Sequence, residues 1–214
     1  MVGATETKST GREIAALLLE IGAIKLNLAD PFKWSSGWNS PIYCDNRLSL
    51  SYPDTRTFIK NALANAIKKR FPDVQAIGGV ATAGIPQGAL VADALDIPFV
   101  YVRSKPKGHG MENMIEGKVT KGQKVVLIED LVSTGGSSLK AAEALKNAGF
   151  IVMGMAAIFT YGFDLARDNF EQANIPLICL SDYNLLLEEA LKQGKIKEEQ
   201  LETLESWRSD PAGW

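Results

Sequence analysis

The sequence has little of several features that mark common protein classes. Its two cysteines, Cys44 and Cys179, lie far apart between apolar residues, which argues against a disulfide framework and favours small reduced side chains in the interior over nucleophiles. No apolar run approaches the roughly 18 residues that a transmembrane helix requires. Residues 1–10 are polar and lack the apolar centre of a signal peptide. We therefore expect a cytoplasmic protein with no membrane partner.

An excess of charge of one sign is also missing. The 214 residues include 23 Lys and Arg against 25 Asp and Glu, a formal net charge of −2. This balance gives no reason to expect nucleic acid or an anionic membrane as a main partner. The chain is long enough for one sizeable core, and 46% hydrophobic and 22% charged residues are ordinary for a globular domain.

Helical spacing of apolar residues predicts two helices near the N-terminus. The first is capped by Ser9 or Thr10 and ended by Gly22, and the second is capped by Asp54 and ends near Phe71. After them, short apolar runs alternate with helical patterns. The expected strands are 76–80, 99–102, 125–128, 151–159 and 176–180, and the expected helices are 84–95, 137–148 and a charged tail over 183–207. This alternation predicts an α/β fold, with a parallel sheet flanked by helices.

The most informative stretch is 125–138, Val-Val-Leu-Ile-Glu-Asp-Leu-Val-Ser-Thr-Gly-Gly-Ser-Ser. Its apolar run predicts a buried strand that the adjacent acids Glu129 and Asp130 close, and a Ser/Thr/Gly turn then leads into a helix. Amides at a helix N-terminus can cradle a phosphate, and glycines let the backbone approach it closely. The two carboxylates can accept hydrogen bonds from the vicinal hydroxyls of a ribose. The stretch is therefore suited to a phosphorylated sugar.

The alternative is an ordinary α/β turn in which the serines and glycines serve as cap and turn residues. Two adjacent acids at the end of a buried strand argue against it, because repulsion and desolvation disfavour them unless something binds there. No lysine follows the glycines, so the stretch is not the P-loop of nucleotide triphosphatases. Its spacing also differs from the dinucleotide fingerprint.

Two further segments follow strands of the predicted sheet. Residues 103–117 form a polar loop, long for a compact domain, with the chain's single histidine, His109, and glycines that allow hinge motion. Its cations could neutralise a departing pyrophosphate and its closure could exclude water, although a solvated surface loop has the same composition. Residues 78–86 form a second Gly-rich turn from strand to helix. Its amides could hold a pyrophosphate, or its small residues could serve packing alone.

Residues 125–138 resemble the PRPP-binding motif of type I phosphoribosyltransferases. Residues 35–47, Ser-Ser-Gly-Trp-Asn-Ser-Pro-Ile-Tyr-Cys-Asp-Asn-Arg, resemble the N-terminal segment of orotate phosphoribosyltransferases, and residues 101–110 extend the match over most of 10–185. The chain is similar to the bacterial branch with the Glu-Asp form of the motif. The resemblance implies transfer of 5-phosphoribosyl from PRPP to orotate in de novo pyrimidine biosynthesis, forming orotidine 5′-monophosphate and pyrophosphate. The alternatives are a purine-type phosphoribosyltransferase and a non-catalytic PRPP-sensing regulator.

The resemblance also implies an organisation. The fold would be of the type I phosphoribosyltransferase kind, with a small N-terminal hood. Residues 1–50 would form an N-terminal helix and the hood over the base, 51–182 the PRPP-binding core, and 183–214 a helical tail packed on the same domain. The 103–117 loop would reach into the neighbouring active site of a homodimer. Mg²⁺ would be held mainly by PRPP, pyrophosphate and water, without a dedicated protein site.

By the same resemblance, three sets of residues would form the active site. The catalytic residues would be Arg103, Lys107, His109 and Asp130. PRPP would be bound by Arg103, Lys105, Lys107, His109, Glu129, Asp130, Leu131, Val132, Ser133, Thr134, Gly135, Gly136 and Ser137. Orotate would contact Ser36, Gly37 and Ser133.

The chain departs from this pattern at positions around the base and the pyrophosphate. Many orotate enzymes carry Lys where this chain has Ser35, Ala83 and Ser104, and some carry Arg near Tyr161 to meet the carboxylate of orotate. A buried carboxylate must find partners. Backbone amides of the hood and Lys33 are the candidates.

Overall fold

A six-stranded sheet organises the molecule, for which the computed structural model describes residues 4–34, 37–105 and 114–214. Its order is β10-β9-β8-β5-β6-β7. All pairings are parallel except that of β6 with β7, which is antiparallel. The strands are β5 (Ala76–Val80), β6 (Phe99–Val102), β7 (Ile115–Glu116), β8 (Lys124–Val132), β9 (Ile151–Thr160) and β10 (Leu177–Asp182).

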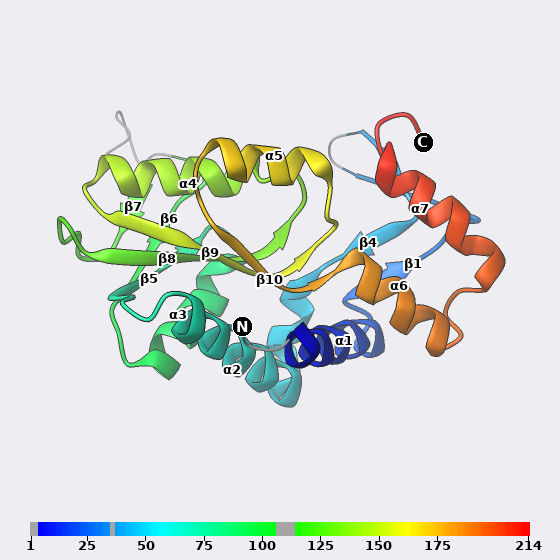
Figure 1. Ribbon diagram of the computed structural model, residues 1–214, viewed down its shortest axis with the longest axis horizontal. Helices are drawn as coiled ribbons and strands as arrows, with labels where there is room; N and C mark the ends of the chain where they lie inside the picture. The colour runs from blue at the N-terminus through cyan, green and yellow to red at the C-terminus, as the bar shows by residue number, and fades with distance from the viewer. Residues whose placement is uncertain (1–3, 35–36, 106–113) are drawn as a thin grey trace.

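Helices cover both faces of this sheet, as the parallel topology requires (Figure 1). One face carries α1 (Ala4–Glu20), α2 (Pro53–Arg70) and α3 (Gly84–Leu95), and the other carries α4 (Gly136–Asn147) and α5 (Asp164–Gln172). The tail forms α6 (Tyr183–Lys192), the short 3-10 helix η3 (Glu198–Gln200) and α7 (Leu201–Ser209). The predicted α/β fold is therefore confirmed.

The core lies in two layers that the strands separate. Along β8, Val126 and Ile128 pack in the cluster beneath α1, α2 and α3, whereas Val125 and Leu127 pack in the cluster beneath α4. This alternation follows from the two-residue period of a strand, and every one of these four side chains is fully buried. Because β8 is apolar on both faces, its end is held rigidly in the middle of the sheet.

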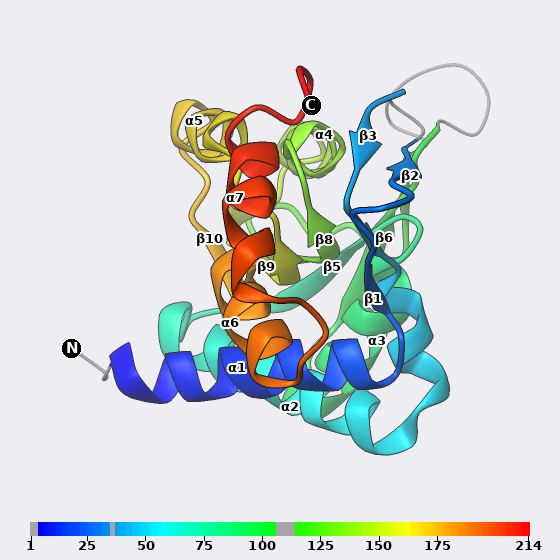
Figure 2. The same cartoon turned by 90° about the vertical axis from the view of Figure 1, so that its right-hand side faces the viewer.

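The N-terminal block adds two small antiparallel pairs at the carboxyl end of the main sheet (Figure 2). In the first, β1 (Ile24–Leu26) pairs with β4 (Ile42–Cys44). In the second, β2 (Phe32–Lys33) pairs with β3 (Asn39–Ser40), and the 3-10 helix η1 (Asn46–Ser51) leads on to α2. We call residues 24–51 the hood segment.

Several element boundaries differ from the sequence predictions. The first helix begins at Ala4, so Ser9 and Thr10 lie inside it rather than at its cap. Asp54 lies in the first turn of α2, whose N-cap is Tyr52 and whose first residue is Pro53. Strand β8 continues through the two acids to Val132, because its backbone keeps pairing with β9 there.

The sequence analysis also missed two elements. Helix α5 was not expected, because seven of its nine residues, Asp-Leu-Ala-Arg-Asp-Asn-Phe-Glu-Gln, are polar or exposed, and only Ala166 and Phe170 are buried. Strand β7 lies within the segment that was expected to be loop up to residue 117. Within the described residues, the structure contains no helix with the length and apolar character needed to cross a membrane.

Candidate active site

The central strand β8 carries two adjacent carboxylates to the carboxyl edge of the sheet. Glu129 is 6% exposed; its Oε1 accepts a hydrogen bond from the backbone N–H of Asp130 (3.2 Å) and its Oε2 accepts one from the hydroxyl of Ser138 (3.2 Å). Burial is the main cause that raises the pKa of both carboxyls, and the neighbouring charge of Asp130 raises that of Glu129 further. Hydrogen-bond donors of a ligand would therefore stabilise the ionised forms.

These acids open onto a pocket of about 320 Å³, which we call the acid pocket. Three segments that are distant in sequence form its walls: the end of the hood segment, the turn after β5, and the end of β8 with the start of α4. The lining residues are Cys44, Asp45, Arg47, Ala81, Thr82, Ala83, Glu129, Asp130, Leu131 and Ser137. The structure thus brings the predicted residues Glu129, Asp130, Leu131 and Ser137 together with the predicted Gly-rich turn.

The Ser/Thr/Gly turn between β8 and α4 presents an uncapped helix start. The N-cap is Gly135, which has no side chain to accept the first amide N–H groups of α4 and which adopts a φ of 81°. A Cβ at this position would also lie 2.7 Å from the ring of Phe170 on α5. Asn169 donates a hydrogen bond to the carbonyl of Thr134 (2.9 Å) and holds the turn from the same helix. A rigid turn with free amides at a helix N-terminus is suited to phosphate.

The other predicted turn, Ala81 to Ala83, joins β5 to α3 on the opposite wall of the acid pocket. The peptide bond between Ala81 and Thr82 is cis. Gly84 begins α3 so close to the carbonyl of Ile128 on β8 that no Cβ would fit between them. The glycines of this segment therefore do serve close packing, and that packing sets the turn against the acids.

A buried polar network ties the hood segment to β8. Asn46, 1% exposed, donates from Nδ2 to the carbonyl oxygen of Asp130 (2.7 Å), and its Oδ1 accepts from the thiol of Cys44 (3.3 Å). Beside it, Arg47 forms two hydrogen bonds to the carboxylate of Asp45, at 2.6 and 2.9 Å. Sequence reasoning did not assign a role to Asn46. Its only local signal is its place between two charged residues just after an apolar strand.

The ends of the 103–117 segment form a hairpin rather than a free loop. Tyr101 pairs with Glu116 and Val102 with Ile115, and the N–H of Arg103 donates to the carbonyl of Met114 (2.7 Å). Arg103 forms an ion pair with Glu116 (Nη1 to Oε1, 3.1 Å), and neither it nor Lys105 lines the acid pocket. The predicted residues Lys107 and His109 lie outside the described residues.

At the hood tip, Gly37 closes a tight turn between β2 and β3. Its N–H donates to the carbonyl of Trp34 (2.9 Å), and the N–H of Trp34 donates to the carbonyl of Trp38 (2.9 Å). Of the predicted orotate contacts, Gly37 is exposed in this turn, and Ser36 lies outside the described residues. The Gly37 amide, one of the candidates for the carboxylate of orotate, is thus already hydrogen-bonded. Lys33, the other candidate, is exposed on β2.

The tail contributes a buried tryptophan beneath the hood. Trp207 on α7 is 0% exposed and donates from Nε1 to the carbonyl of Asn39 (3.2 Å) on β3. Its ring lies 5.6 Å from that of Trp34, 5.8 Å from that of Tyr161 and 5.6 Å from that of Phe163. Edge contacts between aromatic rings at these separations are favourable beyond the area that they bury. The hood, the end of β9 and the tail therefore share one aromatic cluster.

Beside this cluster lies a second pocket of about 360 Å³, which we call the tail pocket. The hood gives Trp38, and the Ser/Thr/Gly turn after β8, which we call the phosphate turn, gives Thr134. The turn from β9 into α5 and the end of the tail form the rest of the wall. The lining residues are Trp38, Thr134, Gly162, Phe163, Asp164, Leu165, Arg208, Ser209, Pro211 and Ala212. Neither Arg208 nor Trp207 was among the candidates from sequence.

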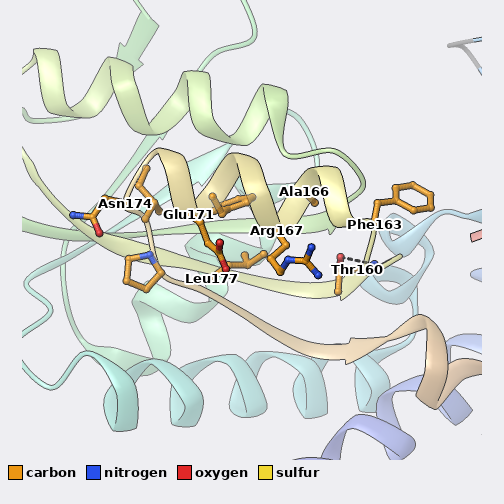
Figure 3. A pocket seen from close by; sticks show the side chains of 11 residues that line it. Thr160, Phe163, Ala166, Arg167, Glu171, Asn174 and Leu177 are labelled. Carbon is orange, nitrogen blue, oxygen red and sulfur yellow. Dashed lines mark hydrogen bonds between the residues drawn. The ribbon is translucent and has the colours of Figure 1, made fainter. Parts of the chain in front are cut away.

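A pocket of about 620 Å³, larger than the acid pocket and the tail pocket, lies between α5, the end of β9 and the start of β10 (Figure 3). Arg167 and Glu171 project into it from α5, opposite Leu177. Arg167 is paired with Asp164 (2.7 Å) on the same helix. No predicted site residue lines this pocket, so its size does not make it the reactive site.

Both cysteines are half-buried, whereas the sequence predicted small side chains in the interior. Burial raises the pKa of the Cys44 thiol well above its usual value and that of Cys179 to about 12. A thiol with a raised pKa is protonated at neutral pH and is a poor nucleophile. Although Cys44 lines the acid pocket, it acts there as a hydrogen-bond donor to Asn46.

Comparison with known proteins agrees with this geometry. Residues 53–177 match the model of the phosphoribosyl transferase domain, so fold, pocket and sequence together define a phosphoribosyltransferase of type I fold. The chain is 56% identical over 203 residues to the orotate phosphoribosyltransferase of Cytophaga hutchinsonii, covering 95% of this chain and 97% of that protein. It is 56% identical over 207 residues to the enzyme of the same name from Porphyromonas gingivalis, covering 97% and 99%.

A solved structure gives the same result. The orotate phosphoribosyltransferase of Aeropyrum pernix superposes with a TM-score of 0.75 at 30% identity, covering 86% of this chain and 99% of that chain. The chain belongs to the orotate phosphoribosyltransferase family. The resemblance seen in the motifs at 35–47, 101–110 and 125–138 is thereby confirmed.

Proposed function

We propose that this protein transfers the 5-phosphoribosyl group of PRPP to N1 of orotate, forming orotidine 5′-monophosphate and pyrophosphate in de novo pyrimidine biosynthesis. The observation that carries the proposal is the acid pocket, where Glu129 and Asp130 stand beside an uncapped helix start in a chain 56% identical to orotate phosphoribosyltransferases. The carboxylates suit ribose hydroxyls and the amides suit a phosphate. Among the residues that the structure describes, no observation favours a purine substrate or a regulator without catalysis.

In the proposed donor site, each part of PRPP lies against a different wall of the acid pocket. The 5′-phosphate would lie against the amides of Ser133 to Ser137, and the 2′- and 3′-hydroxyls of ribose would donate to Glu129 and Asp130. The pyrophosphate would then face the turn at Ala81 to Ala83. Hydroxyl donors offset the desolvation that raises the pKa of the two carboxyls.

In the proposed reaction, the protein forms no covalent bond to the substrates and acts by positioning them and stabilising charge. As the bond between C1 and the pyrophosphate oxygen breaks, positive charge develops on the sugar and negative charge on the leaving group. The bond from N1 of orotate to C1 forms, and the proton of N1 passes to the released pyrophosphate or to water. Fixed carboxylates below the ring can stabilise the first charge, and cations can stabilise the second. We propose Arg103, Lys107 and His109 for that second role, with Lys105 as a helper.

Arg103 has to leave Glu116 to act in this way. The 3.1 Å ion pair between them is more than one third exposed on each side, and such pairs contribute little to stability. A pyrophosphate can therefore compete for the guanidinium. We therefore propose that Arg103 contacts pyrophosphate only when substrate is bound and is paired with Glu116 otherwise.

Magnesium fits the donor set of the acid pocket. Mg²⁺ prefers oxygen ligands and retains water, and the carboxylates of Glu129 and Asp130 line the pocket where ribose and pyrophosphate would lie. When bound it would neutralise charge on the phosphates. We propose that the substrate carries most of its ligands.

We further propose that the protein acts as a homodimer in which the 103–117 segment of one copy serves the acid pocket of the other. Arg103 and Lys105 do not line the acid pocket of their own chain, which supports this arrangement. A cytoplasmic location and the absence of nucleic-acid partners remain predictions from the sequence.

The test is direct. Purified protein with PRPP, Mg²⁺ and orotate should lose orotate absorbance and release one pyrophosphate for each orotate consumed. Uracil, adenine, hypoxanthine and xanthine serve as alternative acceptors in parallel reactions. Turnover of a purine in place of orotate, or PRPP binding with no turnover of any base, would overturn the proposal.

A further inference from the structure

The proposed acceptor carries a charge that none of the predicted residues explains. Orotate has a carboxylate at C6, adjacent to the N1 that reacts, and burying it needs a cation or several donors. The Gly37 amide is bonded to Trp34, and Lys33 is exposed on the far strand of the hood hairpin. Neither of these two groups is a buried, unpaired donor, so we looked for a cation on another element.

Arg208 is in position to supply it. It lies on α7, lines the tail pocket with Trp38 of the hood and Thr134 of the phosphate turn, and is partly buried. A Cβ built on Gly162, just beyond β9, would lie 3.8 Å from its Nη1. The guanidinium thus stands between the carboxyl end of the sheet and the hood, where the base of a nucleotide held by β8 and α4 would lie.

Other arginines near the pockets already have acidic partners. Arg47 is paired with Asp45 (2.6 Å), Arg103 with Glu116 (3.1 Å) and Arg167 with Asp164 (2.7 Å). The last of these pairs matters most, because Asp164 is the acid that also lines the tail pocket. Within the described part of the chain, no hydrogen bond or ion pair engages the guanidinium of Arg208.

The backbone that carries Arg208 is held firmly. Its neighbour Trp207 is fully buried in the aromatic cluster and bonded to Asn39 of the hood, and α7 packs beside the hood hairpin (Figure 2). The buried Leu204 adds a second anchor one turn earlier, where its carbonyl accepts from the hydroxyl of Tyr183 (3.1 Å). Binding then has to order only the side chain of Arg208 and not its backbone, which limits the entropic cost.

We propose that the tail pocket is the carboxylate subsite of the acceptor and that Arg208 is the residue that binds the carboxylate of the pyrimidine base. The inference rests on the proposed function, since it needs an orotate-type acceptor. It assigns to the C-terminal tail a role in base selection, because a neutral base such as uracil gains nothing from the guanidinium.

The experiment compares two nucleotides that differ only in the carboxylate, orotidine 5′-monophosphate and uridine 5′-monophosphate. Their affinities are measured by calorimetry for the wild type and for Arg208→Gln. We expect the variant to bind orotidine 5′-monophosphate about 10- to 100-fold more weakly and uridine 5′-monophosphate within about 2-fold of wild type. Arg208→Lys, which keeps the charge without the planar fork, should fall between.

The four affinities, of two nucleotides for two proteins, separate the possible outcomes. Equal weakening of both nucleotides would show that Arg208 binds the 5′-phosphate or supports the fold, and no change in either would show that it binds nothing; both results overturn the inference. Arg167→Gln, an arginine of the neighbouring pocket, is the matched control and should change neither affinity. Wild-type protein that neither turns over orotate nor prefers the carboxylated nucleotide would overturn the proposed function itself.

Discussion

At the scale of single residues, Glu129 and Asp130 of β8 favour different protonation states in the empty pocket and in the occupied pocket. Burial favours their protonated forms, whereas hydrogen bonds from a bound sugar favour the carboxylates. Ionisation of these carboxyls therefore lowers the stability of the free protein, whereas it favours binding of the sugar. The next two predictions concern the effect of Glu129 on stability and the effect of Asp130 on turnover.

The first prediction concerns stability and pH. Glu129 holds its proton to a higher pH when folded than when unfolded, so stability is lost as pH rises from the usual glutamate pKa towards the raised one. Glu129→Gln removes this titration. We expect its Tm to exceed that of wild type by a margin that grows between about pH 5 and about pH 8, by roughly 4 °C for each pKa unit relieved.

Thermal unfolding without substrate, followed by circular dichroism across this range, measures that margin. Glu188→Gln, at an exposed carboxylate paired with Arg12, is the control and should show no such growth. A margin for Glu129→Gln that stays constant with pH would contradict the prediction.

The second prediction concerns turnover. Asp130→Asn keeps the shape of the side chain but removes the charge that would stabilise the sugar in the transition state, so kcat should fall by about 100-fold or more. The Tm should stay within a few degrees of wild type, because the backbone hydrogen bond from Asn46 is retained. Steady-state kinetics with PRPP and orotate measure the effect.

Asp73→Asn is a matched control for this variant. Asp73 is exposed at the other end of the sheet, where it pairs with Lys124 (3.1 Å). Its variant should keep wild-type turnover. Near-normal kcat in Asp130→Asn would remove this residue from the reactive site.

At the scale of elements, Asn46 fixes η1 to the end of β8. Asn46→Ala leaves the carbonyl of Asp130 without its buried donor, which costs about 1–3 kcal/mol of folding free energy. Because the lost bond supports the peptide of Asp130, kcat at saturating substrate should fall as well. The exposed Asn184→Ala on α6 provides a comparison that should change neither quantity.

Unfolding in denaturant gives the first quantity and saturating kinetics give the second. If Asn46→Ala loses stability but keeps full kcat in buffer where it is wholly folded, the bond serves packing alone.

The same scale shows what could be predicted from sequence. The strands at 76–80 and 99–102 and the helix at 84–95 agree with the structure to the residue, because each is a short apolar or amphipathic run between clear breakers. Helix α5 could not be found in this way, since its polar sequence is held by two side chains that pack on α4 and the sheet. The extension of β8 to Val132 was missed because Glu129 and Asp130 have low strand propensity.

The acids and the phosphate turn could likewise be predicted, since one continuous stretch contains them. Asn46 and Arg208 could not. Each acts on a part of the site that lies far away in sequence, as the contact between Asn46 and Asp130 shows. Such pairs follow from the packing of the hood and the tail, on which local spacing gives no information.

At the scale of the whole molecule, N-terminal block, sheet and tail share one buried cluster that runs from Ile14 to Trp207. The three-part division at residues 50 and 182 remains a prediction about organisation. In the proposed homodimer, the segment that begins with Arg103 in one copy completes the active site of the other copy. This arrangement has its own test.

We expect Lys107→Ala and His109→Ala to reduce kcat by about 100-fold with a modest loss of PRPP affinity, because each removes a cation from the leaving group. Heterodimers of Lys107→Ala with Asp130→Asn, purified with two different affinity tags, should regain activity. One of their two sites then combines the intact 103–117 segment of the Asp130→Asn chain with the intact acid pocket of the Lys107→Ala chain. Homodimers of each variant processed in the same way are the controls. Inactive heterodimers would count against the shared site.

The position of Trp207 has a consequence for biogenesis. Synthesis runs from the N-terminus, so every strand of the sheet and both acids leave the ribosome before α7 does. A chain cut short by proteolysis or premature termination before residue 201 would still contain every residue that lines the acid pocket, but the aromatic cluster under the hood would lack its central ring. Donor recognition is thus encoded early in the chain and acceptor recognition last, and the hood that walls both pockets gains its anchor only when α7 has been made.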